Sequence, residues 1–382
     1  MVNPFLGVFF HWLGGLASAS FYIPYRGVKK WSWETYWLVG GVFSWIIAPL
    51  FVAWLLVPDV WNVIGTAYAN NPTEVVWAYI FGTMWGLGGL TFGLTMRYLG
   101  IALGMAVALG YCAAFGTLMP PIFDGTIRTI IHETSGQIIL AGVAICLAGI
   151  GVTGMAGMSK ERELSEEEKQ ATVKEFNFFK GILVATFSGI MSAAFAYGLA
   201  VGAPIGDLAK ATLLEQGHND IWQNLPVLVV VLWGGFTTNF IWCLILNIMN
   251  RSSHEYFALH KEIISERNRN DDESDTAQVH SERVPILGNY LFSALAGVTW
   301  YLQFFFYSMG QTRMGKYEFS SWTLHMASII IFSSLWGIAL REWKGTSRRT
   351  HVLLAIGLVI LIGSTIIVGY GNFLKEPPGV SQ

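Results

Sequence analysis

Ten long apolar stretches limit most strongly what this chain can fold into. A helix of roughly 20 mostly apolar residues spans a bilayer hydrocarbon core, which is about 30 Å thick. Hydropathy places such stretches at residues 5–25, 33–57, 75–98, 101–123, 136–157, 179–203, 223–249, 285–309, 319–340 and 351–371. The sequence therefore predicts an all-α integral membrane protein with ten transmembrane helices.

Composition agrees with a membrane protein and excludes several other classes. Charged residues make up 13% of the chain and hydrophobic residues 53%, whereas about a quarter of a soluble domain is charged. The net charge of −2 argues against a nucleic-acid partner. Cys112, Cys146 and Cys243 lie inside apolar stretches without metal-site spacing, so we expect no metal and no cofactor. The first stretch lacks the features of a cleaved signal peptide, so we expect it to be a permanent span.

The distribution of Lys and Arg predicts the orientation. Of the 23 basic residues, 18 lie in the loops after the first, third, fifth, seventh and ninth stretches. Cytoplasmic loops carry such an excess of Lys and Arg. We therefore expect these loops in the cytoplasm and both termini on the opposite side.

Two of the expected cytoplasmic loops are long and polar. Residues 158–178 form a charged connector rich in helix formers. Residues 250–284 begin with a helical pattern and include an acidic tract at 270–275. Such tracts are usually solvated, with a regulatory or partner contact as the alternative. We expect no folded extramembrane domain in either loop, and we expect residues 376–382 to form a tail after the second half.

The two halves of the chain share a weak internal repeat. The pattern GxxSAxF occurs at residues 15–21 and 189–195, and GxxW followed fifteen residues later by Gly occurs at 82–100 and 297–315. Because five spans is an odd number, the halves would insert with opposite orientation, as in many secondary transporters. We predict a 5+5 inverted-topology repeat, with residues 1–157 as the first half and 179–375 as the second. The glycines could instead serve static helix packing.

Ionisable residues inside the spans are the first candidates for chemistry, because each is costly in a bilayer unless it is paired or faces a polar cavity. His11 and His325 lie at similar depth toward the outward side, each on a polar helix face. Histidine exchanges protons near neutral pH, and a buried carboxyl group can do the same. The proton-coupling candidates are Glu34, His11, His325 and Glu318. The alternatives are satisfied core histidines and, for Glu34, an interfacial cap beside nearby lysines.

Deep tryptophans with polar neighbours suggest a second kind of site. Trp85 and Trp300 occupy equivalent points of the repeat. A neutral polyol needs hydrogen-bonding groups for its hydroxyls and flat apolar surfaces for its C–H faces, although both tryptophans could equally be packing residues. The substrate-binding candidates are Trp85, Trp300, Gln303, Tyr301, Trp322, Ser18 and Tyr22.

Five segments of the chain resemble a known family. They read FFHWLGGLASASFY around His11, VKKWSWETYWLVGGVFSWII from Val28, FGTMWGLGGLTFGLTMRYLG from Phe81, WYLQFFFYSMGQTR from Trp300 and SSWTLHM from Ser320. These runs are similar to the bacterial L-rhamnose–proton symporter family of the drug/metabolite transporter superfamily. The resemblance covers nearly the whole chain.

The resemblance implies a multi-pass protein of the bacterial cytoplasmic (inner) membrane that imports L-rhamnose, or a related 6-deoxyhexose, with a proton. It also implies ten helices, a site enclosed by spans 1–4 and 6–9, and a high rank for Glu34, which lies in the WSWET run. Together with the distribution of basic residues, it leads us to expect both termini on the periplasmic side. The residues alone predict only a secondary transporter with a polar, aromatic-lined cavity.

Other readings stay open at this point. The substrate could be another small metabolite, and the protein could be a homo-oligomer. The chain has no GxSxG, HExxH or paired intramembrane Asp motif, so we expect no enzyme. A scaffold or receptor without transport would leave the polar helix faces unexplained.

Overall fold

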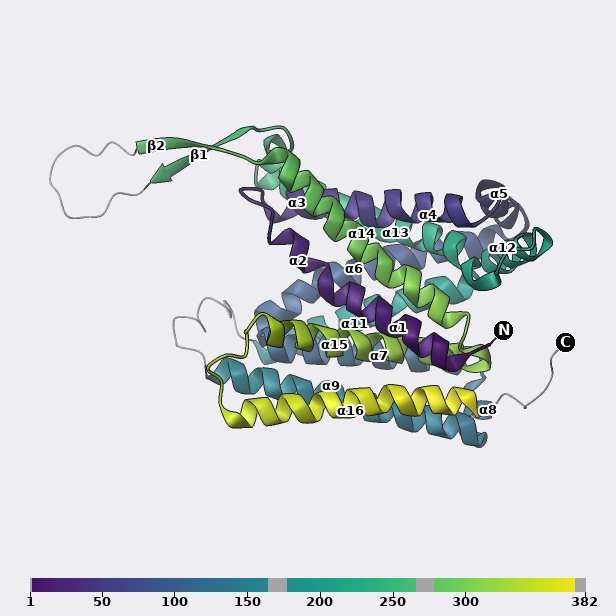
Figure 1. The fold of residues 1–382 in the computed structure, drawn as a ribbon. Helices are drawn as coiled ribbons and strands as arrows, with labels where there is room; N and C mark the ends of the chain where they lie inside the picture. The colour runs from purple at the N-terminus through teal and green to yellow at the C-terminus, as the bar shows by residue number, and fades with distance from the viewer. Residues whose placement is uncertain (1, 164–176, 266–277, 375–382) are drawn as a thin grey trace.

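The computed structural model describes residues 2–163, 177–265 and 278–374, which form a bundle of long helices with one projecting β ribbon (Figure 1). The helices that make up the body of the bundle are α1 (Pro4–Ser20), α3 (Trp33–Val42), α4 (Ala48–Leu56), α6 (Pro72–Leu99), α7 (Ile101–Phe123), α9 (Thr134–Arg162), α11 (Phe178–Val201), α13 (Leu225–Met249), α14 (Ile286–Gln311), α15 (Ser321–Ala339) and α16 (Arg348–Phe373). Four further helices are α2 (Tyr22–Tyr25), α5 (Val60–Asn70), α8 (Ile127–His132) and α12 (Ala203–Glu215). These four helices lie toward the ends of the bundle (Figure 1).

Nine helices within the described residues are long and apolar enough to cross a membrane. They correspond to every predicted span except 285–309, and their ends lie within a few residues of the predicted ones. At 285–309 the chain forms α14, which has 26 residues but a less apolar sequence that contains Asn289, Ser293 and Gln303. The class of a helical integral membrane protein is therefore confirmed, and the tenth span stays a prediction.

The loop at residues 250–284 departs from the expected helical pattern. After one 3-10 turn, η3 (Ser252–Tyr256), the chain forms β1 (His260–Ser265) and β2 (Gln278–Arg283), which pair antiparallel. The expectation of a helix is wrong beyond this turn, because β-branched residues at 263, 264 and 279 favour paired strands. The acidic tract, the tail and most of the connector lie outside the described residues, although α9 extends into the connector as far as Arg162.

Helix packing joins the two halves of the chain closely. Helix α6 packs against α11 and α13, and α1 packs against α14 and α15. Helices α9 and α16 run side by side along one edge of the bundle (Figure 1). The close approach requires glycine at some contacts, since a Cβ atom at Gly82 would collide with the Val231 carbonyl of α13.

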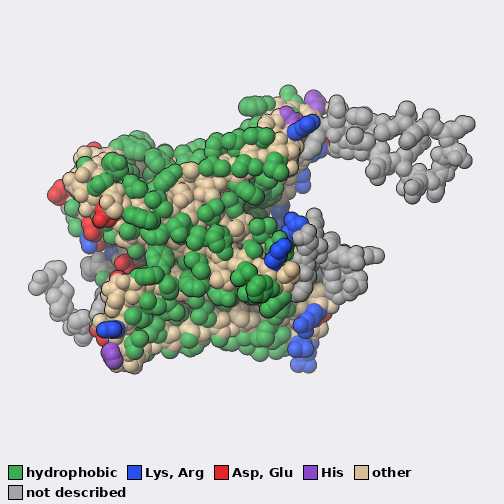
Figure 2. Space-filling view, turned by 180° about the vertical axis from the view of Figure 1, so that it is seen from behind, with side chains coloured by type: hydrophobic (Ala, Val, Ile, Leu, Met, Phe, Trp, Pro, Cys, Tyr) green, Lys and Arg blue, Asp and Glu red, His purple; other side chains and the backbone are tan. Residues whose placement is uncertain are grey.

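The two ends of the bundle differ in charge. Helix α1 begins where α16 ends, with the rings of Phe5 and Phe373 5.4 Å apart, and α5, α8 and α12 lie at this same end (Figure 1). We call it the terminal end, and the opposite end, which carries β1 and β2, the ribbon end. On the face shown in Figure 2, Lys and Arg gather mainly at the ribbon end.

Glu163 fastens the end of α9 to the start of α16 at the ribbon end. Its carboxylate accepts hydrogen bonds from the Ser347 amide and hydroxyl, both at 2.6 Å, and from the Thr350 hydroxyl at 2.7 Å. Ser347 is the N-cap of α16. These bonds favour the charged carboxylate and lower the pKa of Glu163 to about 2.

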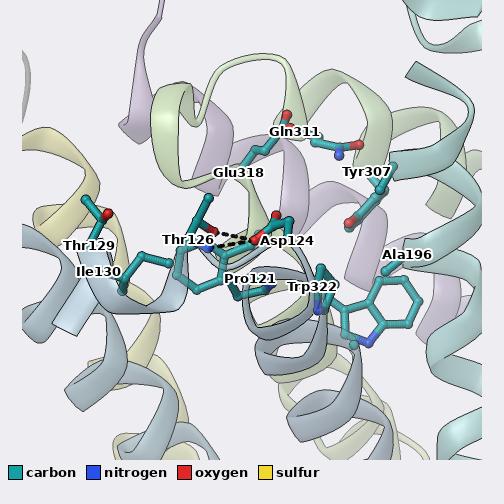
Figure 3. Close-up of a pocket in the computed structure, with 14 residues that line it drawn as sticks. Pro121, Asp124, Thr126, Thr129, Ile130, Ala196, Tyr307, Gln311, Glu318 and Trp322 are labelled. Atoms are coloured by element: carbon teal, nitrogen blue, oxygen red, sulfur yellow. Dashed lines mark hydrogen bonds between the residues drawn. The ribbon is translucent and has the colours of Figure 1, made fainter. Parts of the chain in front are cut away.

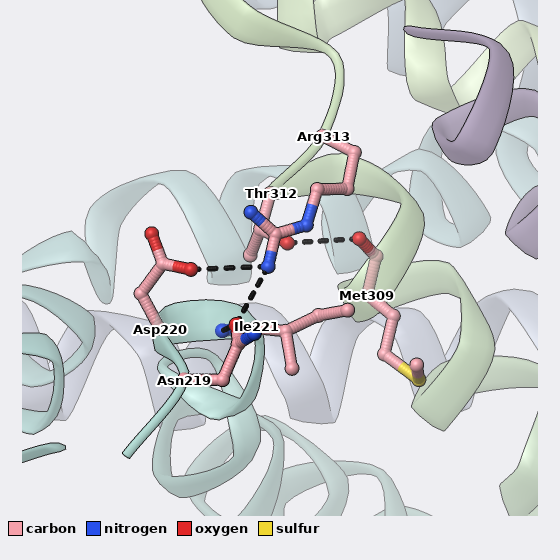
Figure 4. A network of polar contacts seen from close by, with 6 residues as sticks. All are labelled: Asn219, Asp220, Ile221, Met309, Thr312 and Arg313. Atoms are coloured by element: carbon pink, nitrogen blue, oxygen red, sulfur yellow. Dashed lines mark hydrogen bonds and ion pairs between the residues drawn. The ribbon is translucent and has the colours of Figure 1, made fainter. Parts of the chain in front are cut away.

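A buried arginine holds the terminal end together (Figure 4). The Arg313 guanidinium donates to Asn219 Oδ1 at 2.8 Å and forms an ion pair with Asp220 Oδ1 at 3.0 Å. The Arg313 side chain is only 5% exposed. Its backbone carbonyl accepts from the Asn3 amide at 3.1 Å, so one residue connects the end of α14 to the start of α1 and to η2 (Asp220–Trp222) before α13.

The orientation expected from the basic residues predicts which end of the bundle can be labelled from outside the cell. A cysteine at exposed Asn70, at the terminal end, should react with an impermeant maleimide in intact cells, and one at Ser281 in β2 should react only after permeabilisation. The native cysteines are buried and provide a low background. If only the cysteine at position 281 reacted in intact cells, the protein would have the opposite orientation in the membrane.

Removal of the buried cation should destabilise the fold. We expect Arg313→Met to lower the free energy of unfolding by roughly 1–3 kcal/mol, because partners at Asn219 and Asp220 lose their donor. Thermal unfolding in detergent measures this, with Arg128→Met on exposed α8 as the matched control. Equal melting temperatures for both variants would show that the network contributes no stability.

Candidate functional site

An aromatic cluster fills the centre of the bundle. The rings of Phe195 in α11 and Phe304 in α14 lie 4.7 Å apart, and the ring of Trp85 in α6 lies 5.3 Å from each. Trp300 contacts Phe304 at 6.0 Å, and Trp322 stacks on Phe195 at 5.7 Å. These five residues, the aromatic cluster, bring three of the predicted substrate residues together from three helices.

The two histidines lie side by side next to this cluster. His11 is 0% and His325 2% exposed, and their ring centroids are 6.5 Å apart. Tyr307 lies 5.2 Å from both rings. Among the described residues, both ring nitrogens of His11 and Nδ1 of His325 have no hydrogen-bond partner. The structure therefore places two polar, buried rings next to each other, both in contact with one tyrosine.

Small residues create the space that the histidines occupy. A Cβ atom at Gly310 would lie 2.8 Å from the His11 ring, and one at Gly14 would lie 3.2 Å from the His325 ring. The Ser328 hydroxyl lies within 2.9 Å of the His11 carbonyl and 2.8 Å of the His325 carbonyl. The contacts of α1 with α14 and α15 thus position both rings.

A cavity of about 380 Å³ opens beside the histidines at the terminal end (Figure 3). Tyr307, Trp322, Glu318 and Gln311 are among its polar and aromatic lining residues. Tyr307 and Trp322 belong to this wall and also contact His325, at 5.2 and 6.3 Å. The histidines therefore lie one side chain behind the wall, and Glu318, which is exposed, lies in the wall itself.

The remaining candidates lie at different depths. Gln303 and Tyr301 in α14 are 3% and 1% exposed, and Gln303 Nε2 and Tyr301 Oη have no partner within the described residues. Ser18 is buried. Tyr22 is 54% exposed and lies near Trp37, with ring centroids 6.3 Å apart, so it does not join the aromatic cluster.

Glu34 lies at the ribbon end rather than beside the histidines. Its carboxylate accepts hydrogen bonds from the Ser252 hydroxyl at 2.6 Å and from Asn250 Nδ2 at 3.0 Å. Glu255 accepts from the Ser32 amide at 2.6 Å and the Thr35 hydroxyl at 3.0 Å nearby. The structure thus separates Glu34 from His11, His325 and Glu318.

Two central residues are missing from the predicted site. Tyr307 contacts both histidines, and Phe195 is the centre of the aromatic cluster. The sequence contained information on both. Tyr307 follows Trp300 and Gln303 on one face of its helix, and Phe195 is the last residue of the repeated GxxSAxF pattern, where Phe21 stands in the first half.

Comparison with known proteins identifies the family. Residues 1–373 match the family model described as L-rhamnose-proton symport protein (RhaT). The chain is 37% identical over 369 residues to the L-rhamnose-proton symporter of Salmonella gallinarum (strain 287/91 / NCTC 13346), covering 96% of this chain and 97% of the relative. The L-rhamnose-proton symporters of Salmonella newport (strain SL254) and Salmonella agona (strain SL483) show the same identity and coverage. The chain belongs to the RhaT family of L-rhamnose-proton symport proteins.

Proposed function

We propose that this protein imports L-rhamnose together with a proton across the bacterial cytoplasmic membrane by alternating access. The observation that carries the proposal is the buried histidine pair behind a polar cavity at the terminal end. This cavity, at about 380 Å³, is in the size range of small-molecule sites. The aromatic cluster beside it offers flat surfaces for the sugar ring, and imidazole rings can take up and release protons near neutral pH.

We also propose the ten-span, 5+5 inverted architecture, with halves at residues 1–157 and 179–375. The helix contacts support it, because the pairs α6–α11, α7–α11 and α6–α13 have their counterparts in α14–α1, α15–α1 and α14–α3. At residue level, Phe195 contacts Trp85 at 5.3 Å, and Phe21, its repeat equivalent, contacts Trp300 at 4.1 Å. Such a repeat is the trait by which we assign the chain to the drug/metabolite transporter superfamily.

In this proposal the structure represents a state closed toward the cytoplasm. At the ribbon end, the Lys29 amide donates to Asn289 Oδ1 at 2.9 Å, and Asn289 Nδ2 donates to the Lys29 carbonyl at 2.8 Å. The Trp37 indole donates to Asn239 Oδ1 at 3.2 Å. With the bonds of Glu34 and Glu255, these contacts join the start of the second span to the second half. They would break when the protein opens inward, with the termini remaining periplasmic.

Transport should depend on the proton gradient. Proteoliposomes with an inward proton gradient should accumulate labelled L-rhamnose, and a protonophore should abolish accumulation. Sodium removal is the control and should leave uptake unchanged. Uptake that is insensitive to the protonophore would point to facilitated diffusion. A binding screen with L-lyxose, L-mannose and L-fucose would reveal a different preferred sugar.

Neutralising the proton carrier should uncouple the two substrates. We expect His11→Gln or His325→Gln to abolish accumulation against a gradient while exchange of labelled for unlabelled L-rhamnose survives, because glutamine keeps much of the polarity but does not titrate. Glu318→Gln and Glu34→Gln complete the set. Exposed His218→Gln is the matched control. Parental accumulation by all four variants would exclude a carrier among these residues.

Gln303 should contribute to sugar binding. Its unpartnered amide nitrogen can donate to a hydroxyl, and loss of one such bond costs about 0.5–1.5 kcal/mol, or up to roughly tenfold in affinity. Calorimetric binding of L-rhamnose to Gln303→Ala measures this, with exposed Gln216→Ala as the control. Unchanged affinity in Gln303→Ala would mean that this side chain only packs.

A further inference from the structure

The second span contains a π-helical turn, η1 (Phe43–Ile47), between α3 and α4. The Ala48 amide donates to the carbonyl of Phe43, five residues earlier. Pro49 explains the local change, because it has no N–H to donate to the carbonyl of Trp45. A π turn widens a helix locally and is frequent at functional sites. Here the turn contains two buried residues, Ser44 and Trp45.

Ser44 and Trp45 line a small chamber on the ribbon side of the aromatic cluster. The other walls include Phe21, Trp37 and Trp300, and the chamber has a volume of about 10 Å³. Trp45 contacts Trp85 of the aromatic cluster at 6.1 Å, so the chamber adjoins the proposed sugar site. We call it the inner chamber. In this state it has room for a single water molecule at most.

Three polar atoms around the inner chamber have no hydrogen-bond partner among the described residues. They are the Ser44 hydroxyl and the indole Nε1 atoms of Trp45 and Trp300. Ser44 is 1% and Trp45 3% exposed. Buried donors without partners cost free energy, and cost more inside a bilayer, where water is scarce. A ligand that enters the chamber would supply the missing acceptors.

Two glycines bring the helices around the chamber into close contact. Gly40 and Gly297 lie in its wall, and a Cβ atom at Gly297 would collide with the Gly40 carbonyl. Glycine contacts of this kind allow two helices to approach closely and to slide. A modest separation of α3 and α14 would therefore enlarge the chamber.

We propose that Ser44, Trp45 and Trp300 form a second sugar subsite, which receives L-rhamnose in the inward-facing state. This inference rests on the proposed transport of the sugar. The indole N–H groups donate to sugar hydroxyls, the Ser44 hydroxyl donates to or accepts from another, and the aromatic rings cover the C–H face and methyl group of the 6-deoxyhexose. The π turn is the element that presents two of the three groups.

Substitutions that remove the indole N–H and keep an aromatic ring test the subsite, and a control substitution matches the loss of ring size. In inside-out vesicles, Trp45→Phe and Trp300→Phe should each raise the KM for L-rhamnose from the cytoplasmic side by about three- to tenfold, the loss of one hydrogen bond. Trp233→Phe is the matched control, since its Nε1 is also buried without a partner but it does not line the chamber. A parental KM in both chamber variants, or an equal rise in the control, would overturn the proposal.

Chemical labelling provides a second test of the subsite, which does not depend on the folding of the two tryptophan variants. Ser44→Cys should react with a maleimide in inside-out vesicles, and L-rhamnose should slow the reaction at least threefold. Any slowing of the reaction by L-fucose should be no greater than the binding of L-fucose to the protein accounts for. Labelling that L-rhamnose does not change, in a protein that transports the sugar, would overturn the subsite alone. A parent protein that neither transports nor binds L-rhamnose would overturn the proposed function as well.

Discussion

The scarcity of hydrogen-bond partners inside a bilayer is the constraint on which this structure depends. Backbone groups meet it by forming helices, and most intramembrane side chains meet it by being apolar. Two groups of exceptions adjoin the aromatic cluster. Among the described residues, ring nitrogens of the histidine pair on one side, and the Ser44, Trp45 and Trp300 atoms of the inner chamber on the other, have no hydrogen-bond partner. Both places are where a transporter would admit water, a proton or a sugar.

The aromatic cluster separates these two places. Phe195 and Phe304 pack at 4.7 Å, with the cavity of about 380 Å³ toward the terminal end and the chamber of about 10 Å³ toward the ribbon end. The chamber is much smaller than the cavity, which agrees with the hydrogen bonds of Asn289 and Ser252 that hold the helices together at the ribbon end. In the proposed transport cycle, the chamber would enlarge and the cavity would shrink as the two halves of the protein rock against each other.

Local sequence was enough to predict the helices but not which of their faces pack against each other. The apolar runs predicted all nine helices that qualify as spans in the described part of the chain, because length and hydropathy are local properties. The similar depth of His11 and His325 agrees with their contact, whereas the contact of Tyr307 with both rings depends on how α14 is rotated against α1. The β ribbon and the π turn at Phe43–Ile47 arise from strand pairing and from Pro49, and a hydropathy profile detects neither.

Direct observation of proton movement tests the central claim most closely. Proteoliposomes would be prepared without any gradient, with a pH-sensitive dye in the external medium, and L-rhamnose would then be added outside. The account predicts that the medium becomes more alkaline as sugar enters, and that a His11→Gln, His325→Gln double variant binds the sugar without this change. Entry of L-rhamnose into liposomes of the parent protein with no change in external pH would contradict proton symport.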